Sequence, residues 1–161
     1  MISTQQLVDA FERNLKTVQM QTAGLTHADS VLQPPFRGNC LNWVMGHIID
    51  NRNTILRNLG AEPIITEDQA KRYGYGSEPV CEDGDDIMRL ETLLELMAES
   101  QKTLAAALDR IAPEELGKEV QSFAGPTTLG HYLFLLYYHE TYHVGQTEFL
   151  RQLAGTNDKI I

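Results

Sequence analysis

Apolar residues recur every three or four positions along four long segments of the chain, a spacing that lines them up on one face of a helix. The first segment covers roughly residues 3–25, and its apolar stripe consists of Leu7, Phe11, Leu15, Val18 and Leu25. Ser3 and Gln6 have the spacing of a capping box, which marks where a helix begins. The sequence therefore predicts an amphipathic helix over 3–25.

The second and third segments show the same period. The second covers roughly residues 42–59 and stops at Gly60, a residue type that commonly follows the last turn of a helix. The third covers roughly residues 86–112, ends before Pro113, and nearly follows a heptad seam. Such a seam packs against neighbouring helices at a shallow angle, as in a four-helix bundle.

The fourth segment covers roughly residues 128–153, between Gly125-Pro126 and Gly155. No stretch of useful length alternates between apolar and polar residues, so we expect no β-sheet. The fold class predicted from these patterns is all-α, a four-helix bundle. At this length, residues 1–161 are most simply one domain.

The connection between the second and third predicted helices, residues 61–84, is unusually long. It is rich in glycine and proline and carries the tyrosines Tyr73 and Tyr75. A connection of this length within a compact domain is often a lid or a binding loop.

Composition and charge narrow the classes of function. Apolar residues make up 42% of the chain, as in globular proteins, and no apolar run is long enough to span a bilayer. The net charge of −9, from 22 acidic and 13 basic residues, argues against nucleic-acid and anionic-membrane partners. Two cysteines, Cys40 and Cys81, imply no disulfide framework, and the first residues do not resemble a signal peptide. These features predict a cytoplasmic protein.

The most specific chemical signal is His139-Glu140-Thr141-Tyr142-His143 in the fourth predicted helix. Two histidines four residues apart lie on one helix face, where both imidazoles can bind a single metal ion. His47 is the best third ligand, since it is predicted to face the core from another helix. We therefore predict a metal site of His47, His139 and His143. A catalytic site needs about three protein ligands and an open position.

The remaining histidines fit the site less well. His131 is about 12 Å along the helix axis from His139, too far to share one ion, and we expect it at the surface. His27 follows the first predicted helix and is also expected at the surface. Glu91, Glu95 and Glu99 are expected to form a solvated face.

Two known metal motifs overlap the histidine pair. His139-Glu140-x-x-His143 has the letters of the zincin motif, but no third ligand follows downstream. Glu140-x-x-His143 matches half of a di-iron motif, but Val44 stands at the corresponding place before His47. Protease and di-iron chemistry are therefore disfavoured. We weigh Glu140 as a base or as an acceptor behind a ligand, and favour a surface or interhelix glutamate.

The chain resembles the DinB/YfiT-like superfamily of metal-binding four-helix bundles. The resemblance rests on Leu41-Asn42-Trp43-Val44-Met45-Gly46-His47-Ile48, on the segment from His139 to Gln146, and on Thr127-Thr128-Leu129-Gly130. It covers essentially the whole chain. By this resemblance His47, His139 and His143 correspond to the metal-binding triad of the family, and a homodimer is expected.

The resemblance implies function less directly. Some relatives are metal-dependent enzymes that use a low-molecular-weight thiol, as S-transferases or as an isomerase. The leading hypothesis is a metal-dependent transferase or hydrolase that activates a thiol or water for a small-molecule substrate. The alternative is a non-catalytic metal-binding stress or structural protein. Nickel, zinc, iron and manganese all remain candidates for the metal, since availability decides between them.

Other residues are candidates for roles around the metal. Asn51 and Gln146 lie within a turn of the ligands and could orient them, or they could be ordinary polar residues of a helix face. Contacts to the carboxylates of a thiol or to the substrate could come from Arg37, Arg72, Tyr73 and Tyr75, whose alternative role is that of solvated loop residues.

Overall fold

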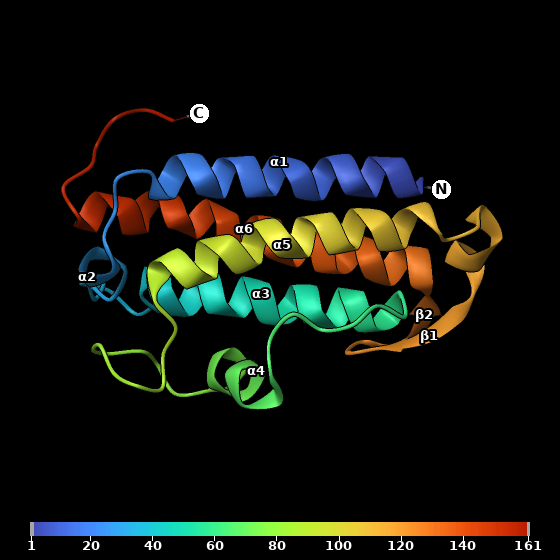
Figure 1. Ribbon diagram of the computed structural model, residues 1–161, viewed down its shortest axis with the longest axis horizontal. Helices are drawn as coiled ribbons and strands as arrows, with labels where there is room; N and C mark the ends of the chain where they lie inside the picture. Colours follow the sequence, from blue (N-terminus) through green and yellow to red (C-terminus); the bar gives the residue numbers. More distant parts are fainter. Residues whose placement is uncertain (1, 161) are drawn as a thin grey trace.

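The computed structural model describes residues 2–160. Four long helices dominate it: α1 (Thr4–Thr22), α3 (Leu41–Asn58), α5 (Leu90–Asp109) and α6 (Leu129–Leu153). They lie side by side in a bundle, in which α1 and α3 each pack against both α5 and α6 (Figure 1). The all-α bundle predicted from the sequence is confirmed.

The helix directions differ from a simple up-and-down order. Figure 1 shows α1 and α6 running one way and α3 and α5 the other. The parallel course of α3 and α5 requires the chain to return along the bundle between them, which explains the long connection. This connection includes α4 (Glu67–Tyr73), a short helix that packs against α3. The predicted loop over 61–84 is therefore partly helical, and Thr66 and Gln69 form a capping box that starts α4.

The ends of the helices show where local and tertiary signals compete. The capping box of Ser3 and Gln6 is present at the start of α1. The helix ends at Thr22 rather than at the predicted Leu25, because Gly24 takes a positive φ of 78°. A short helix of one turn, α2 (His27–Ser30), follows.

Helix α5 begins at Leu90 and not at the predicted Asp86. Tertiary contacts hold the preceding residues outside the helix: the Met88 N–H donates to the Tyr73 hydroxyl at 2.7 Å, and Asp86 pairs with Arg72. The Leu90 N–H donates to His27 Nδ1 at 3.2 Å. His27 is 3% exposed, so its predicted surface position is wrong. It is buried because it caps the start of α5.

A small hairpin of β1 (Glu119–Ser122) and β2 (Gly125–Thr128) was not expected from the sequence. It follows a 3-10 turn (Pro113–Gly117) and leads directly into α6. The two strands pair antiparallel, with Glu119 opposite Thr128. Figure 1 shows the hairpin folded back beside the bundle, with its tip toward α4.

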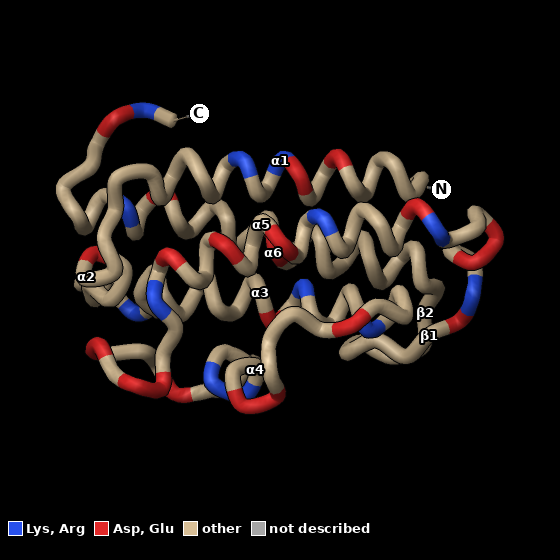
Figure 2. The backbone as a smooth tube through the Cα atoms, viewed as in Figure 1, with Lys and Arg blue, Asp and Glu red and all other residues tan. Residues whose placement is uncertain are grey.

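The core runs through the bundle as two clusters of buried apolar residues. One lies around Trp43, Met45 and Ile48, and the other around Phe11, Leu56 and Leu133. Acidic residues gather in the connection just before α5, whereas the hairpin tip carries no charge (Figure 2). Among residues 2–160, no helix is long and apolar enough to cross a membrane.

Candidate metal centre

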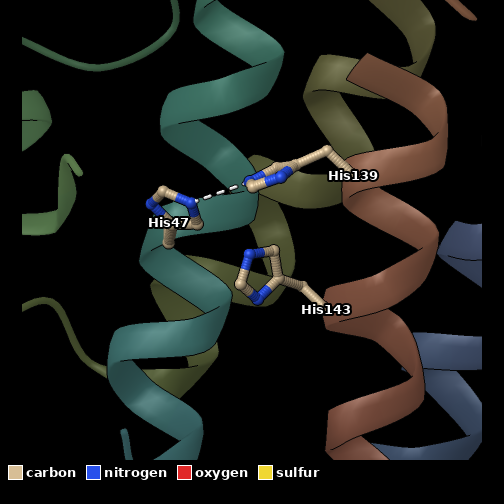
Figure 3. A group of neighbouring side chains, drawn as sticks. All are labelled: His47, His139 and His143. Carbon is tan, nitrogen blue, oxygen red and sulfur yellow. Dashed lines mark hydrogen bonds between the residues drawn. The ribbon is translucent and has the colours of Figure 1, made fainter. Parts of the chain in front are cut away.

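His47 of α3 meets His139 and His143 of α6 near the middle of the bundle (Figure 3). One potential ligand atom from each histidine lies within 4.8 Å of the other two. His47 Nε2 and His139 Nε2 are 3.0 Å apart. The structure thus brings together all three residues predicted as ligands. Within residues 2–160 they form the only group of three or more histidine, cysteine or acidic side chains placed to hold one ion.

The ring of His47 is held in one orientation and one tautomer. Its Nδ1 lies 2.8 Å from the backbone oxygen of Tyr73, and a carbonyl can only accept, so Nδ1 carries the proton. Its Nε2 therefore presents a lone pair toward the other two histidines. Trp43 stacks on the ring, with centroids 4.7 Å apart and planes 12° from parallel. Metal-binding histidines are commonly oriented in this way by a backbone carbonyl.

The close approach of α4 to α3 depends on Gly46. A Cβ at this position would overlap the ring of Tyr73, which is fully buried. The Tyr73 hydroxyl in turn donates to Asn42 Oδ1 and accepts from the Met88 N–H. Gly46 thus lets α4 pack close enough for its last carbonyl to reach His47. Gly46 belongs to the motif that carries the family resemblance, but its structural role could not be predicted from the sequence.

Asn51 and Gln146, which were expected to lie near the ligands, each contact one of the three histidines. His143 Nδ1 donates to Gln146 Oε1 at 2.8 Å, which leaves its Nε2 free. Asn51 Nδ2 donates to the backbone oxygen of His47 at 2.9 Å and lies 3.1 Å from His47 Nε2. Gln146 therefore orients a ligand, whereas Asn51 stands beside a ligand atom.

Burial keeps the three imidazoles neutral. Desolvation lowers the pKa of His143 to about 4, partly opposed by its hydrogen bond to Gln146. Desolvation also lowers the pKa of His47 and of His139, the latter helped by the neighbouring His47. Neutral imidazole is the form that binds metal ions. The cluster is therefore in the ligand-ready state at neutral pH.

Glu140, next to His139, faces the opposite way and is fully buried. Its two oxygens accept from Arg52 Nε and Nη2 of α3, at 2.9 and 2.8 Å. Asn14 of α1 also donates to it, at 3.2 Å. Glu140 is thus the interhelix glutamate that the sequence favoured. The role of Arg52 could not be predicted from the sequence, because its partner Glu140 lies 88 positions away.

Several other candidate residues lie away from the three histidines. Tyr73 is buried in the core, and Arg72 is held by Asp86 and by the backbone oxygen of Glu78, at 2.7 and 2.8 Å. Arg37 is exposed on the loop before α3, as is His131 at the start of α6. Cys40 is buried and Cys81 exposed, without a disulfide between them. Neither Arg37 nor Arg72 lines the cavity beside the three histidines.

A cavity of about 460 Å³ opens beside the cluster. Its lining residues are His47, Asn51, Tyr75, Phe123 and His139. Ligand sites in proteins typically have volumes of roughly 300–1,000 Å³. Two of the three histidines thus face a space that a small molecule can enter. Phe123 comes from the unexpected hairpin, so sequence patterns gave no signal for it.

Comparisons with known proteins agree with this architecture. The sequence model described as DinB superfamily matches residues 10–147. A conserved protein from Enterococcus faecalis has a similar crystal structure, with a TM-score of 0.74 and 19% identity, covering 97% of this chain and 99% of the other. A DinB-like protein from Bacillus cereus has a TM-score of 0.70 and 18% identity, covering 98% and 97% of the two chains. No curated protein sequence matches significantly.

Proposed function

The chain belongs to the DinB superfamily, and from this membership and the geometry of the histidines we propose that it is a metal-dependent enzyme. His47, His139 and His143 hold a divalent transition metal, and the open side of the site takes a small thiol or a water molecule. The reaction class is thiol transfer or hydrolysis on a small-molecule substrate. The observation that carries the proposal is the convergence of three neutral imidazoles beside an open cavity.

The donor set fits a metal ion of the first transition row. Three imidazoles are the ligands of several catalytic zinc sites, and imidazole also suits nickel and iron. His47 Nε2 and His139 Nε2 lie 3.0 Å apart. Since His47 Nε2 carries no proton, either a hydrogen bond from His139 Nε2 or a shared cation accounts for this contact. When bound, the metal would lower the pKa of a thiol or water and supply a nucleophile at neutral pH.

The protein's own groups hold the ligands and shape access. The Tyr73 carbonyl and the stacked Trp43 fix His47, and Gln146 fixes His143. Asn51 donates through Nδ2 at the border of the cavity, where it can hydrogen-bond a molecule that enters. The buried Arg52–Glu140 pair keeps α3 and α6 in register on the opposite side. These groups would orient the reactants and exclude water, which is what a site of this kind requires.

A purely structural metal site is the alternative. Structural sites are closed by a fourth protein ligand, whereas catalytic sites keep a position open. Here three candidate ligands border a cavity, and Asn51, the polar neighbour, presents an amide nitrogen rather than an oxygen. This arrangement favours turnover over a structural or storage role.

The test is metal analysis of protein purified without an affinity tag. We expect near-stoichiometric metal in the wild type and its loss in His143→Ala. His131→Ala is the matched control, since it removes an exposed histidine from the same helix and should leave the metal content unchanged. Wild type that holds no metal after reconstitution with nickel, zinc, iron and manganese would overturn the proposal.

Loaded protein is then screened with low-molecular-weight thiols and electrophiles, and with hydrolysable esters and amides. Turnover that is lost in His143→Ala and retained in His131→Ala is the expected result. Full metal occupancy without turnover across both reaction classes would favour the non-catalytic alternative.

A further inference from the structure

The cavity beside the histidines has an unusual mouth. Tyr75 is 99% exposed and Phe123 is 74% exposed, yet both line the cavity. Tyr75 lies in the connection after α4, and Phe123 lies at the turn of the β1–β2 hairpin. Two segments far apart in the sequence thus place aromatic rings over one opening.

The two rings make few contacts within the protein, so they contribute little to its stability. Phe123 meets Tyr132 edge-on at 6.0 Å between centroids, and most of its surface remains in water. Tyr75 stands between Gly74 and Gly76, and the φ of Gly76 is +81°. A large apolar ring held in water at a cavity mouth gains free energy when another apolar surface covers it. The two rings are therefore placed to bury themselves against a ligand.

The cavity also lacks charged side chains. None of its five lining residues is lysine, arginine, aspartate or glutamate. The segments that carry the two rings, 73–77 and 120–128, contain no charged residue either, and the hairpin tip is uncharged in Figure 2. Asp50, beside Asn51 on α3, brings a carboxylate near Gly74 rather than a cation. An anionic group of a ligand would therefore find no cationic side chain among the residues that line the cavity.

We infer that this site selects a small molecule with a flat, uncharged apolar body, which packs on Tyr75 and Phe123 while one donor atom faces the three histidines. The inference rests on the proposed function, since the metal must bind the donor atom of the ligand. It narrows the class of thiol or electrophile that the site accepts. A thiol or electrophile that carries carboxylates fits the cavity poorly, and one with an aromatic or similar uncharged body fits it well.

The experiment uses cobalt-loaded protein and two thiols that differ in one carboxylate. Benzyl mercaptan and 4-(mercaptomethyl)benzoate are titrated by calorimetry and by the charge-transfer absorption of a cobalt–thiolate bond. We expect benzyl mercaptan to bind at least about tenfold more tightly, because burial of an unpaired carboxylate is costly. 2-Mercaptoethanol, which lacks the apolar body, serves as the reference for the sulfur alone.

Variants then test the two rings. Tyr75→Ala and Phe123→Ala should each weaken benzyl mercaptan about 3- to 10-fold, the range expected for loss of one aromatic contact. The affinity for 2-mercaptoethanol should not change. Tyr75→Phe keeps the ring and should keep the affinity. Phe149→Ala removes an exposed aromatic ring that lies on α6, outside this cavity, and is the matched control.

Each outcome bears on a separate claim. Equal affinity for the two aromatic thiols, or no effect of either alanine variant in protein that holds cobalt, would overturn the inference and leave the metal site standing. Protein that takes up no cobalt would overturn the proposed function and the inference with it.

Discussion

Two polar clusters lie in the middle of this bundle, and they are built in opposite ways. Around Arg52 every polar group has a partner. The guanidinium donates to Glu140, to the side chains of Ser100 and Gln101 on α5, and to one backbone carbonyl each of α1 and α5. Around His47 the nitrogens face one another, and a cavity opens beside them. His139 and Glu140 are neighbours in the sequence, yet each belongs to a different cluster.

This difference separates two uses of buried polarity. A charge pair whose hydrogen bonds are all made within the protein holds helices together and leaves nothing for a ligand. Three neutral imidazoles whose nitrogen lone pairs converge beside a cavity leave a place for a bound cation. The first cluster should therefore govern stability, and the second should govern metal binding.

The largest expected effect is on folding stability. Glu140→Ala leaves the guanidinium of Arg52 buried without its anion, and we expect the free energy of unfolding to fall by about 3–5 kcal/mol. Urea denaturation of metal-free protein measures it. Glu99→Ala removes an exposed carboxylate from α5 and should change stability by no more than about 0.5 kcal/mol.

A double variant distinguishes the pair from simple packing. Arg52→Met combined with Glu140→Leu removes both charges and fills the space with apolar atoms. Its free energy of unfolding should therefore be higher than that of Glu140→Ala. If Glu140→Ala were as stable as Glu99→Ala, water would have to reach Arg52, and the closed character of this cluster would be wrong.

The sequence predicted these two clusters unequally. His139 and His143 could be found because their spacing on one helix is local, and His47 because it lies on an apolar face. Arg52 could not, since a single arginine in a helix is usually solvated and its partner lies on another helix. The Tyr73 carbonyl was equally hidden, because a backbone group carries no residue signature.

The fold shows the same division. The four helices follow from apolar spacing and were found to within a few residues, since that signal extends over many turns. The hairpin was missed because each strand has only four residues, too few for alternation to be visible, and Pro126 weakens the strand pattern. Burial of His27 was missed because it depends on Leu90 and Asp83, far along the chain.

The second prediction concerns acid stability of the metal-free protein. The pKa of His143 is about 4 when folded and 6.5 in the unfolded chain, so protons bind the unfolded chain preferentially between these values. Stability should therefore fall as pH falls from about 6.5 to 4, by roughly 3 kcal/mol from His143 alone. Urea midpoints across this range measure it. The His143→Gln variant should show a clearly shallower decline, and an identical decline would mean that His143 is already solvated.

The smallest expected effect concerns how the open cluster is oriented. Gln146→Ala removes the acceptor that fixes the His143 ring, 2.8 Å from Nδ1, but no metal ligand. We expect the affinity for zinc to fall about 10- to 100-fold, as for other residues that orient a metal-binding histidine. Gln152→Ala, an exposed glutamine on the same helix, is the control. Competition with a chelating dye measures the zinc affinity of both variants.

Because the Arg52–Glu140 cluster is untouched, the unfolding free energy of metal-free Gln146→Ala should stay within about 0.5 kcal/mol of wild type. A large loss of stability with unchanged zinc affinity would reverse the roles assigned to the two clusters.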